Sequence, residues 1–154
     1  MDNWAQRHIG TPYDADGDWA SQGQAHQVLL DRMLADPYFA RTGPKSTGRE
    51  YFHEAWLAAH LKHTPGVSAV DVQATLATLT ATTIADSLQQ VARDTSELYI
   101  CGGGARNAHL MRLLQQRLPA QKVLPYTIPK CGPKNLYAEH AKKSQSNACT
   151  SISS

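Results

Sequence analysis

Apolar residues recur every three or four positions along much of the first 120 residues of the chain. This spacing is that of one buried face of an α-helix. The longest run follows Ser68, and its apolar members are Val70, Ala74, Ala77, Ala81, Ile84, Leu88 and Val91. Ser68 and Asp71 have the S-x-x-D spacing that can bond open N–H groups at a helix start. The pattern predicts one helix of about 24 residues, whose small alanines let it lie close to a sheet or a central helix.

Three shorter helices are predicted by the same spacing, over residues 18–35, 49–62 and 107–118. Each ends close to a proline, which cannot continue a helix. In the first of them, the residues expected to face inward are Val28, Leu29, Met33 and Leu34. Residues 1–8 also read as helical, although no capping residue precedes them.

Two segments read as β-strands, residues 97–101 and 122–126, and they flank the predicted helix at 107–118. A strand, a glycine-rich turn, a helix and a second strand in this order form a right-handed βαβ unit with parallel strands. Two strands cannot cover four or five helices in a complete layer. The predicted fold class is therefore α/β, helix-rich with a small parallel sheet.

Net charge changes sign along the chain. Residues 1–120 hold 10 Lys and Arg against 12 Asp and Glu, whereas residues 121–154 hold 5 Lys against Glu139 alone. With this break in composition and a serine-rich ending, residues 127–154 are expected to form a disordered tail. A basic tail can bind nucleic acid, but this one has no periodic face and a single aromatic residue, Tyr137, so no nucleic-acid partner is expected.

The composition is that of one globular domain, with 154 residues of which 42% are hydrophobic and 18% charged. No apolar stretch approaches the roughly 18–20 residues that span a bilayer, and the chain opens without a basic and then apolar leader. No membrane association is expected. Three cysteines without a CxxC pair give neither a disulfide framework nor a zinc ribbon. We therefore expect a cytoplasmic location.

The most informative segment is the glycine turn, defined here as residues 101–107 with the sequence CGGGARN. Gly102, Gly103 and Gly104 let a ligand approach the backbone without meeting a Cβ, and the helix that follows offers free N–H groups near Asn107. This arrangement favours a nucleotide, although the G-x-G-x-x-G fingerprint is absent because position 107 is Asn. The alternative is a tight connection that binds no ligand.

Three other motifs are less specific. Residues 43–50 carry two cations at a predicted helix start and form either a capped helix entrance or a polar wall of a substrate cleft. Asp14, Asp16 and Asp18 resemble a calcium loop, but Trp19 and Ala25 stand where that loop needs glycine and an acid, so they are expected in an exposed loop without metal. No HExxH zinc motif and no G-x-S-x-G nucleophile motif occurs in the sequence, so no metal ligand or catalytic nucleophile is assigned.

Five segments together resemble one family, the anhydro-N-acetylmuramic acid kinases of bacterial cell-wall recycling. They occur in the family's order and spacing, and they are MDNW (1–4), DPYF (36–39), PKSTGRE (44–50), DVQATL (71–76) and CGGGARN (101–107). The resemblance implies an actin-like, sugar-kinase fold of two lobes. It also implies that ATP and magnesium are used to phosphorylate 1,6-anhydro-N-acetylmuramic acid while water opens the anhydro ring, which gives the 6-phosphate. Gly102, Gly103, Gly104 and Asn107 would then contact the adenosine of ATP.

Two departures from the family pattern qualify the resemblance. The family's phosphate-binding hairpin and catalytic Asp, in a GFDTGPGN-like segment, have no counterpart here, and the family's ending is not recognisable after Tyr126. Residues 1–126 are therefore expected to be a partial second lobe, followed by a divergent tail over residues 127–154. No catalytic residue is assigned, and the chain is expected to be inactive alone. The alternative is a non-catalytic fragment, or half of a split protein that docks on a separate first lobe or forms a homodimer.

Overall fold

The structure is a computed structural model and describes residues 1–41, 51–126 and 148–152. Its helical elements, in chain order, are α1 (Asp2–Ile9), the 3₁₀ turn η1 (Ala15–Gly17), α2 (Asp18–Ser21), α3 (Gln27–Leu34), α4 (Pro37–Ala40), α5 (Glu54–Leu61), α6 (Ala69–Val91), the 3₁₀ turn η2 (Gly103–Arg106) and α7 (Ala108–Arg117). Its strands are β1 (Glu97–Gly102), β2 (Lys122–Pro125) and β3 (Ala148–Ile152).

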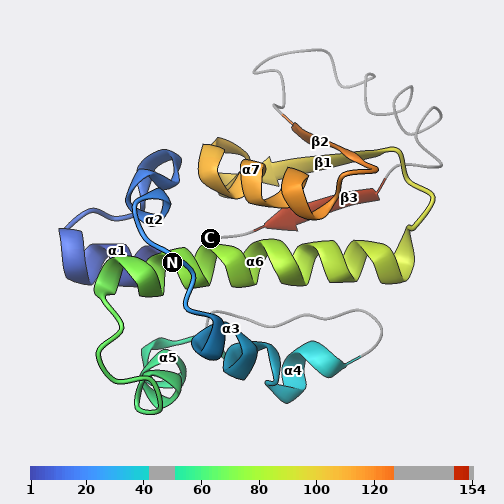
Figure 1. The fold of residues 1–154 in the computed structure, drawn as a ribbon. Helices are drawn as coiled ribbons and strands as arrows, with labels where there is room; N and C mark the ends of the chain where they lie inside the picture. The colour runs from blue at the N-terminus through green and yellow to red at the C-terminus, as the bar shows by residue number, and fades with distance from the viewer. Residues whose placement is uncertain (42–50, 127–147, 153–154) are drawn as a thin grey trace.

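Helix α6 is the central element, and it separates two groups of elements (Figure 1). The strands and α7 lie on one side of it, here called the sheet side, and α3, α4 and α5 lie on the other, the helical side. The predicted start is confirmed, because the Ser68 hydroxyl accepts a hydrogen bond from the Asp71 N–H. Val91, expected on the buried face, is 81% exposed because it ends the helix beyond both groups.

On the sheet side, α6 and α7 cover the same face of β1. Leu98 and Ile100 alternate with Tyr99 along the strand, so both point to that face, and both are fully buried. The core there is completed by Ala81, Ala85, Leu88, Leu110, Leu114 and Leu118. Each large aliphatic side chain buried in this way contributes about 1.5–3 kcal/mol, so this cluster holds α6, β1 and α7 together.

The sheet has the order β2-β1-β3, and both pairings are parallel. The predicted βαβ unit is confirmed, with Glu97 opposite Lys122 and Ile100 opposite Pro125. The third strand was not predicted. It falls in the expected disordered tail, and that expectation is wrong for residues 148–152, which pair with β1 through the backbone. The rest of that tail, residues 127–147 and 153–154, lies outside the described residues.

The single helix predicted over residues 18–35 is wrong, because it is divided into α2 and α3. Gly23 lies so close to α6 that an added Cβ would come within 2.5 Å of the Val70 carbonyl oxygen. The next residues then bond to α6 instead of continuing a helix, since the Gln24 N–H donates to Asp71 Oδ1 (2.8 Å). Because α3 begins only at Gln27, Val28, which was expected to face inward, is 57% exposed.

The helix predicted over residues 49–62 is shorter than expected. It starts after His53, whose ring Nδ1 accepts a hydrogen bond from the Trp56 N–H (3.3 Å) and so caps α5. Residues 42–50 lie outside the described residues, so the two readings of the 43–50 motif remain untested. Among the helices that the structure describes, none combines the length and apolar character needed to cross a bilayer.

Candidate functional site

The glycine turn connects the end of β1 to the start of α7. Gly102 closes the strand with φ 79° and ψ −157°, a conformation that is sterically costly for any residue with a Cβ. Gly103 opens η2, and Asn107 follows as the N-cap of α7. The turn therefore lies outside the carboxyl end of a parallel strand, which is where α/β sheets commonly bind ligands.

The structure brings all four predicted site residues into this one turn, with different exposure. Gly102 and Gly103 are exposed, Asn107 is partly buried and Gly104 is buried. The exposed pair can meet a ligand directly, whereas Gly104 supports the turn from within. Its carbonyl accepts a hydrogen bond from the Asn107 N–H (3.1 Å).

Asn107 has a defined structural task. Its side-chain Oδ1 accepts a hydrogen bond from the Leu110 N–H (2.8 Å), which satisfies one of the N–H groups left open at the start of α7. The cap orients the first turn of α7, and the positive end of the helix dipole then points at the glycine turn. An anionic or strongly polar ligand group is favoured at that position.

Asp14 lies near this turn. The prediction that it lies in an exposed loop is wrong. Asp14 is buried, and its carboxylate accepts hydrogen bonds from the N–H groups of Trp19 and Ala20 at the start of α2 (both 2.9 Å). It also accepts one from the side-chain amide of Gln73 on α6 (3.1 Å). Asp16 and Asp18 are exposed, as predicted. Asp14 thus ties the segment before α2 to the central helix.

His109 lies on the first turn of α7, next to the glycine turn. Burial lowers the pKa of His109, and the neighbouring Arg112 guanidinium lowers it further, while the Asp14 carboxylate acts in the opposite direction. The net effect favours the neutral imidazole near pH 7. The positive charge near the turn is therefore carried by arginine, including Arg106 at the end of η2.

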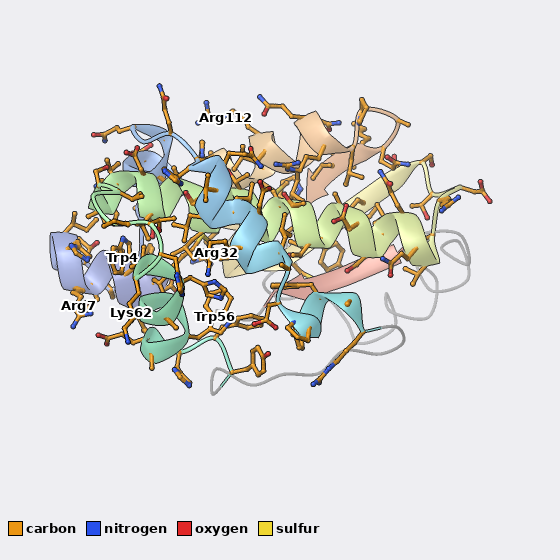
Figure 2. All side chains as sticks on the ribbon, turned by 60° about the horizontal axis from the view of Figure 1, so that its bottom comes forward. Trp4, Arg7, Arg32, Trp56, Lys62 and Arg112 are labelled. Carbon is orange, nitrogen blue, oxygen red and sulfur yellow. The ribbon has the colours of Figure 1, made fainter. Side chains whose placement is uncertain are left out.

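Two open hollows lie elsewhere on the surface. One of about 440 Å³ is next to η1 and has Tyr13 and Trp19 in its wall. The other, of about 460 Å³, lies between α1 and α5, where Trp4, Arg7 and Lys62 surround it (Figure 2). Neither includes a residue of the glycine turn, so the turn is an exposed backbone surface and not the wall of either hollow.

The carboxylates of the described residues are the groups that a magnesium ion would need as ligands. Mg²⁺ in proteins is held by carboxylate oxygens and by the phosphates of its substrate. Within residues 1–41, 51–126 and 148–152, no three His, Cys, Asp or Glu side chains are grouped so that they could hold a metal ion.

A second polar centre lies on the helical side, around Asp36. Its carboxylate accepts hydrogen bonds from the Tyr38 N–H, the Tyr51 hydroxyl and the Trp56 indole N–H, each at 2.8 Å. Burial alone would raise the pKa of Asp36, but these three donors and the nearby His60 outweigh it and leave the pKa below its ordinary value. The carboxylate lies beside an aromatic cluster in which the centroids of neighbouring rings are 4.5–5.5 Å apart. Its members are Tyr38, Phe39, Tyr51, Phe52, Trp56 and His60.

The sequence did not reveal the roles of Asp14, Gln73 or Asp36. Gln73 looked like a polar position on a long helix, yet it is fully buried against Asp14. A local signal existed for one of them, because Asp36-Pro37 places a capping residue before the proline that starts α4. No local signal shows that this same carboxylate binds side chains 15 and 20 residues away.

Comparison with known proteins gives one consistent result. The sequence profile described as anhydro-N-acetylmuramic acid kinase matches residues 1–136. A protein of that name from Pseudomonas putida is 54% identical over 123 residues, which cover 80% of this chain and 34% of that protein. One from Albidiferax ferrireducens is 49% identical over 124 residues, covering 80% of this chain and 32% of that protein. The chain thus spans about a third of the length of these relatives.

Proposed function

The chain belongs to the anhydro-N-acetylmuramic acid kinase family, and from this membership we propose that its glycine turn is the part of a kinase nucleotide site that holds the adenosine of ATP. Gly102, Gly103, Gly104 and Asn107 are the residues assigned to it. The observation that carries the proposal is the left-handed Gly102 between a parallel strand and the start of α7, with Gly102 and Gly103 exposed.

The turn suits a nucleoside better than a phosphate chain. Gly102 and Gly103 are exposed and carry no side chain of their own, so a flat base or a ribose can lie against their backbone. The segment lacks the lysine with which a phosphate loop reaches the β- and γ-phosphates. A phosphate clamp is therefore not assigned to these residues.

We further propose that residues 1–126 are part of the second lobe of a two-lobed, actin-like kinase, with residues 127–154 as a divergent tail. The complete enzyme would transfer the γ-phosphoryl group of Mg-ATP to the O6 of 1,6-anhydro-N-acetylmuramic acid. Water would open the anhydro bridge, and the products would be ADP and N-acetylmuramic acid 6-phosphate. These assignments rest on the family and on the names of the relatives.

Activity of this chain alone is not part of the proposal. Phosphoryl transfer requires an aligned acceptor, a base or positioning group and clamped phosphates. Among the described residues, the two carboxylates with the most complete hydrogen bonding are Asp14 and Asp36, and each accepts three bonds that stabilise the fold. We expect no ADP release when the purified chain is mixed with Mg-ATP and the anhydro sugar. Robust turnover would contradict this expectation.

The nucleotide site is tested by titrating the chain with Mg-ATP in a calorimeter, beside the variant Gly103→Val. Gly103 has no left-handed φ, so valine is compatible with its backbone, and its added bulk occupies the exposed surface of the turn. We expect the affinity to fall at least about tenfold, or 1.4 kcal/mol. Ala35→Val, at an exposed residue after α3, is the control and should bind as the unaltered chain does.

Two outcomes would remove the turn from the site. Equal binding by the unaltered chain and Gly103→Val would show that ATP binds elsewhere. No binding by the unaltered chain would favour the alternative of a non-catalytic fragment that only folds, or that needs a partner chain to complete the site.

A further inference from the structure

The end of η1 lies directly against the start of α7. A Cβ built on Gly17 would collide with the Asn107 side-chain oxygen and would come within 2.6 Å of the His109 Cβ. Gly17 is buried, whereas its neighbours Asp16 and Asp18 are exposed. The α-carbon of Gly17 is therefore in contact with the very side chain that caps α7.

The backbone of Gly17 independently requires glycine. Its φ is +72°, in the left-handed region, and it directly follows Asp16 at φ 54°. Gly10 and Gly66 share the left-handed conformation, at φ +69° and +87°, but each faces open space. Comparing the three glycines therefore separates the cost of a left-handed φ from the effect of steric contact. All three are left-handed, and only Gly17 contacts the turn.

The segment that carries Gly17 has little freedom to move away. Asp14 holds the start of α2 through two backbone N–H groups and is itself held by Gln73 of α6. The Gly17 N–H donates to the Asp14 carbonyl (3.2 Å). Any side chain at position 17 would thus displace Asn107 and His109, because η1 is attached to the central helix.

A displacement of Asn107 would disturb two hydrogen bonds, one within α7 and one to the glycine turn. Its Oδ1 accepts from the Leu110 N–H, and its own N–H donates to the Gly104 carbonyl. We propose that Gly17 is a positioning residue for the nucleotide turn: its missing side chain lets Asn107 lie where it both caps α7 and holds Gly104. This inference rests on the proposed nucleotide site, and it adds a residue 85 or more positions distant in sequence that has no contact with ATP itself.

The test compares Gly17→Ala with Gly10→Ala and Gly66→Ala in the full 154-residue chain. All three variants place alanine at a left-handed φ, so all lose some stability for the same backbone reason. Mg-ATP affinity is measured by calorimetry, and amide hydrogen exchange at Leu110 reports on the cap. We expect Gly17→Ala to bind Mg-ATP at least about tenfold more weakly and to exchange faster at Leu110, while the two controls change neither.

Each outcome decides the inference. Gly17→Ala that binds Mg-ATP as the controls do, with normal exchange at Leu110, would overturn it. If the unaltered chain binds no Mg-ATP, the proposed function is wrong, and Leu110 exchange alone then shows whether Gly17 holds Asn107. If Gly17→Ala does not fold, exchange is followed in the unaltered chain instead. Mg-ATP should then slow exchange at both Gly17 and Leu110, and no change at either amide would overturn the inference.

Discussion

The two sides of α6 are built in different ways. The sheet-side core comes from one continuous stretch, residues 81–118, in which α6, β1 and α7 follow one another. The helical-side core gathers Leu29, Leu30, Met33, Leu57, Val72, Leu76 and Leu79 from three separate segments. Trp4 joins from still further away, since its indole N–H donates to the Ala69 carbonyl across 65 residues. The sheet-side core is therefore formed by elements that follow one another in the sequence. The helical-side core depends on contacts between residues that are distant in the sequence.

The two sides also differ in the kind of interaction that stabilises them. The sheet side holds its glycine turn with buried leucine and isoleucine, whereas the helical side surrounds the Asp36 carboxylate with rings and donors. A change on the sheet side should therefore alter both stability and nucleotide binding. A change on the helical side should alter stability alone.

Truncation of a core residue on each side is the strongest test. Ile100→Ala and Met33→Ala each remove a fully buried side chain, and each should lower the free energy of unfolding by about 2–5 kcal/mol. Only Ile100→Ala should also weaken Mg-ATP binding, because Ile100 lies two residues before Gly102 on β1. Urea unfolding and calorimetry measure the two quantities. Val91→Ala, at an exposed position, is the control, and equal loss of binding in both core variants would contradict the comparison.

Removal of the Asp36 carboxylate is the next largest effect. Asp36→Ala leaves the indole N–H of Trp56 and the hydroxyl of Tyr51 without their acceptor, which should lower the free energy of unfolding by about 1–3 kcal/mol. Asp86→Ala, at an exposed position on α6, should change it little. Urea unfolding at pH 7 measures both variants, and similar midpoints for the two would argue against a role for the carboxylate.

The same carboxylate predicts a pH dependence. Because the pKa of Asp36 is lowered in the folded chain, the folded state binds its proton less readily than the unfolded state. Its contribution to stability is fully present above the ordinary Asp pKa and is lost as the pH falls through the lowered value. The stability difference between the unaltered chain and Asp36→Asn should therefore shrink in acid, below about pH 4.

The two helix caps provide a matched pair of smaller changes. Ser68→Ala and Asn107→Ala each remove a side chain that accepts from the third N–H of its helix, and each should lower the free energy of unfolding by about 1 kcal/mol. Only Asn107→Ala should weaken Mg-ATP binding, because Ser68 bonds to Asp71 of its own helix and not to a residue of the glycine turn. A loss of binding in Ser68→Ala would show that the effect is one of general stability.

The surface ion pair between Arg7 and Glu54 should matter least. Both side chains are more than half exposed, at 57% and 62%, and water and salt screen such pairs. Glu54→Gln should change the free energy of unfolding by less than about 1 kcal/mol and leave Mg-ATP binding unaltered. A larger loss, measured in the same urea assay, would mean that this pair is important for the contact between α1 and α5.

The sequence predicted those features whose causes lie within a few residues. The Ser68 start of α6, the parallel βαβ unit and the grouping of Gly102 to Asn107 in one turn all depend on neighbours in the chain. The break at Gly23 could not be predicted in this way, because it is caused by the Val70 carbonyl. The Asp14–Gln73 bond and the pairing of β3 with β1 likewise join segments that periodicity treats separately.

The threonines of α6 have a consequence for the chain before it folds. The hydroxyls of Thr75, Thr80 and Thr82 each donate to the carbonyl four residues earlier, at 2.6–2.9 Å. Their polar atoms are thus satisfied within the helix, and α6 can be covered on both sides without a long run of leucine or isoleucine. A nascent chain emerging from the ribosome therefore exposes a segment rich in alanine and threonine, which is expected to aggregate less readily than a purely aliphatic segment of that length.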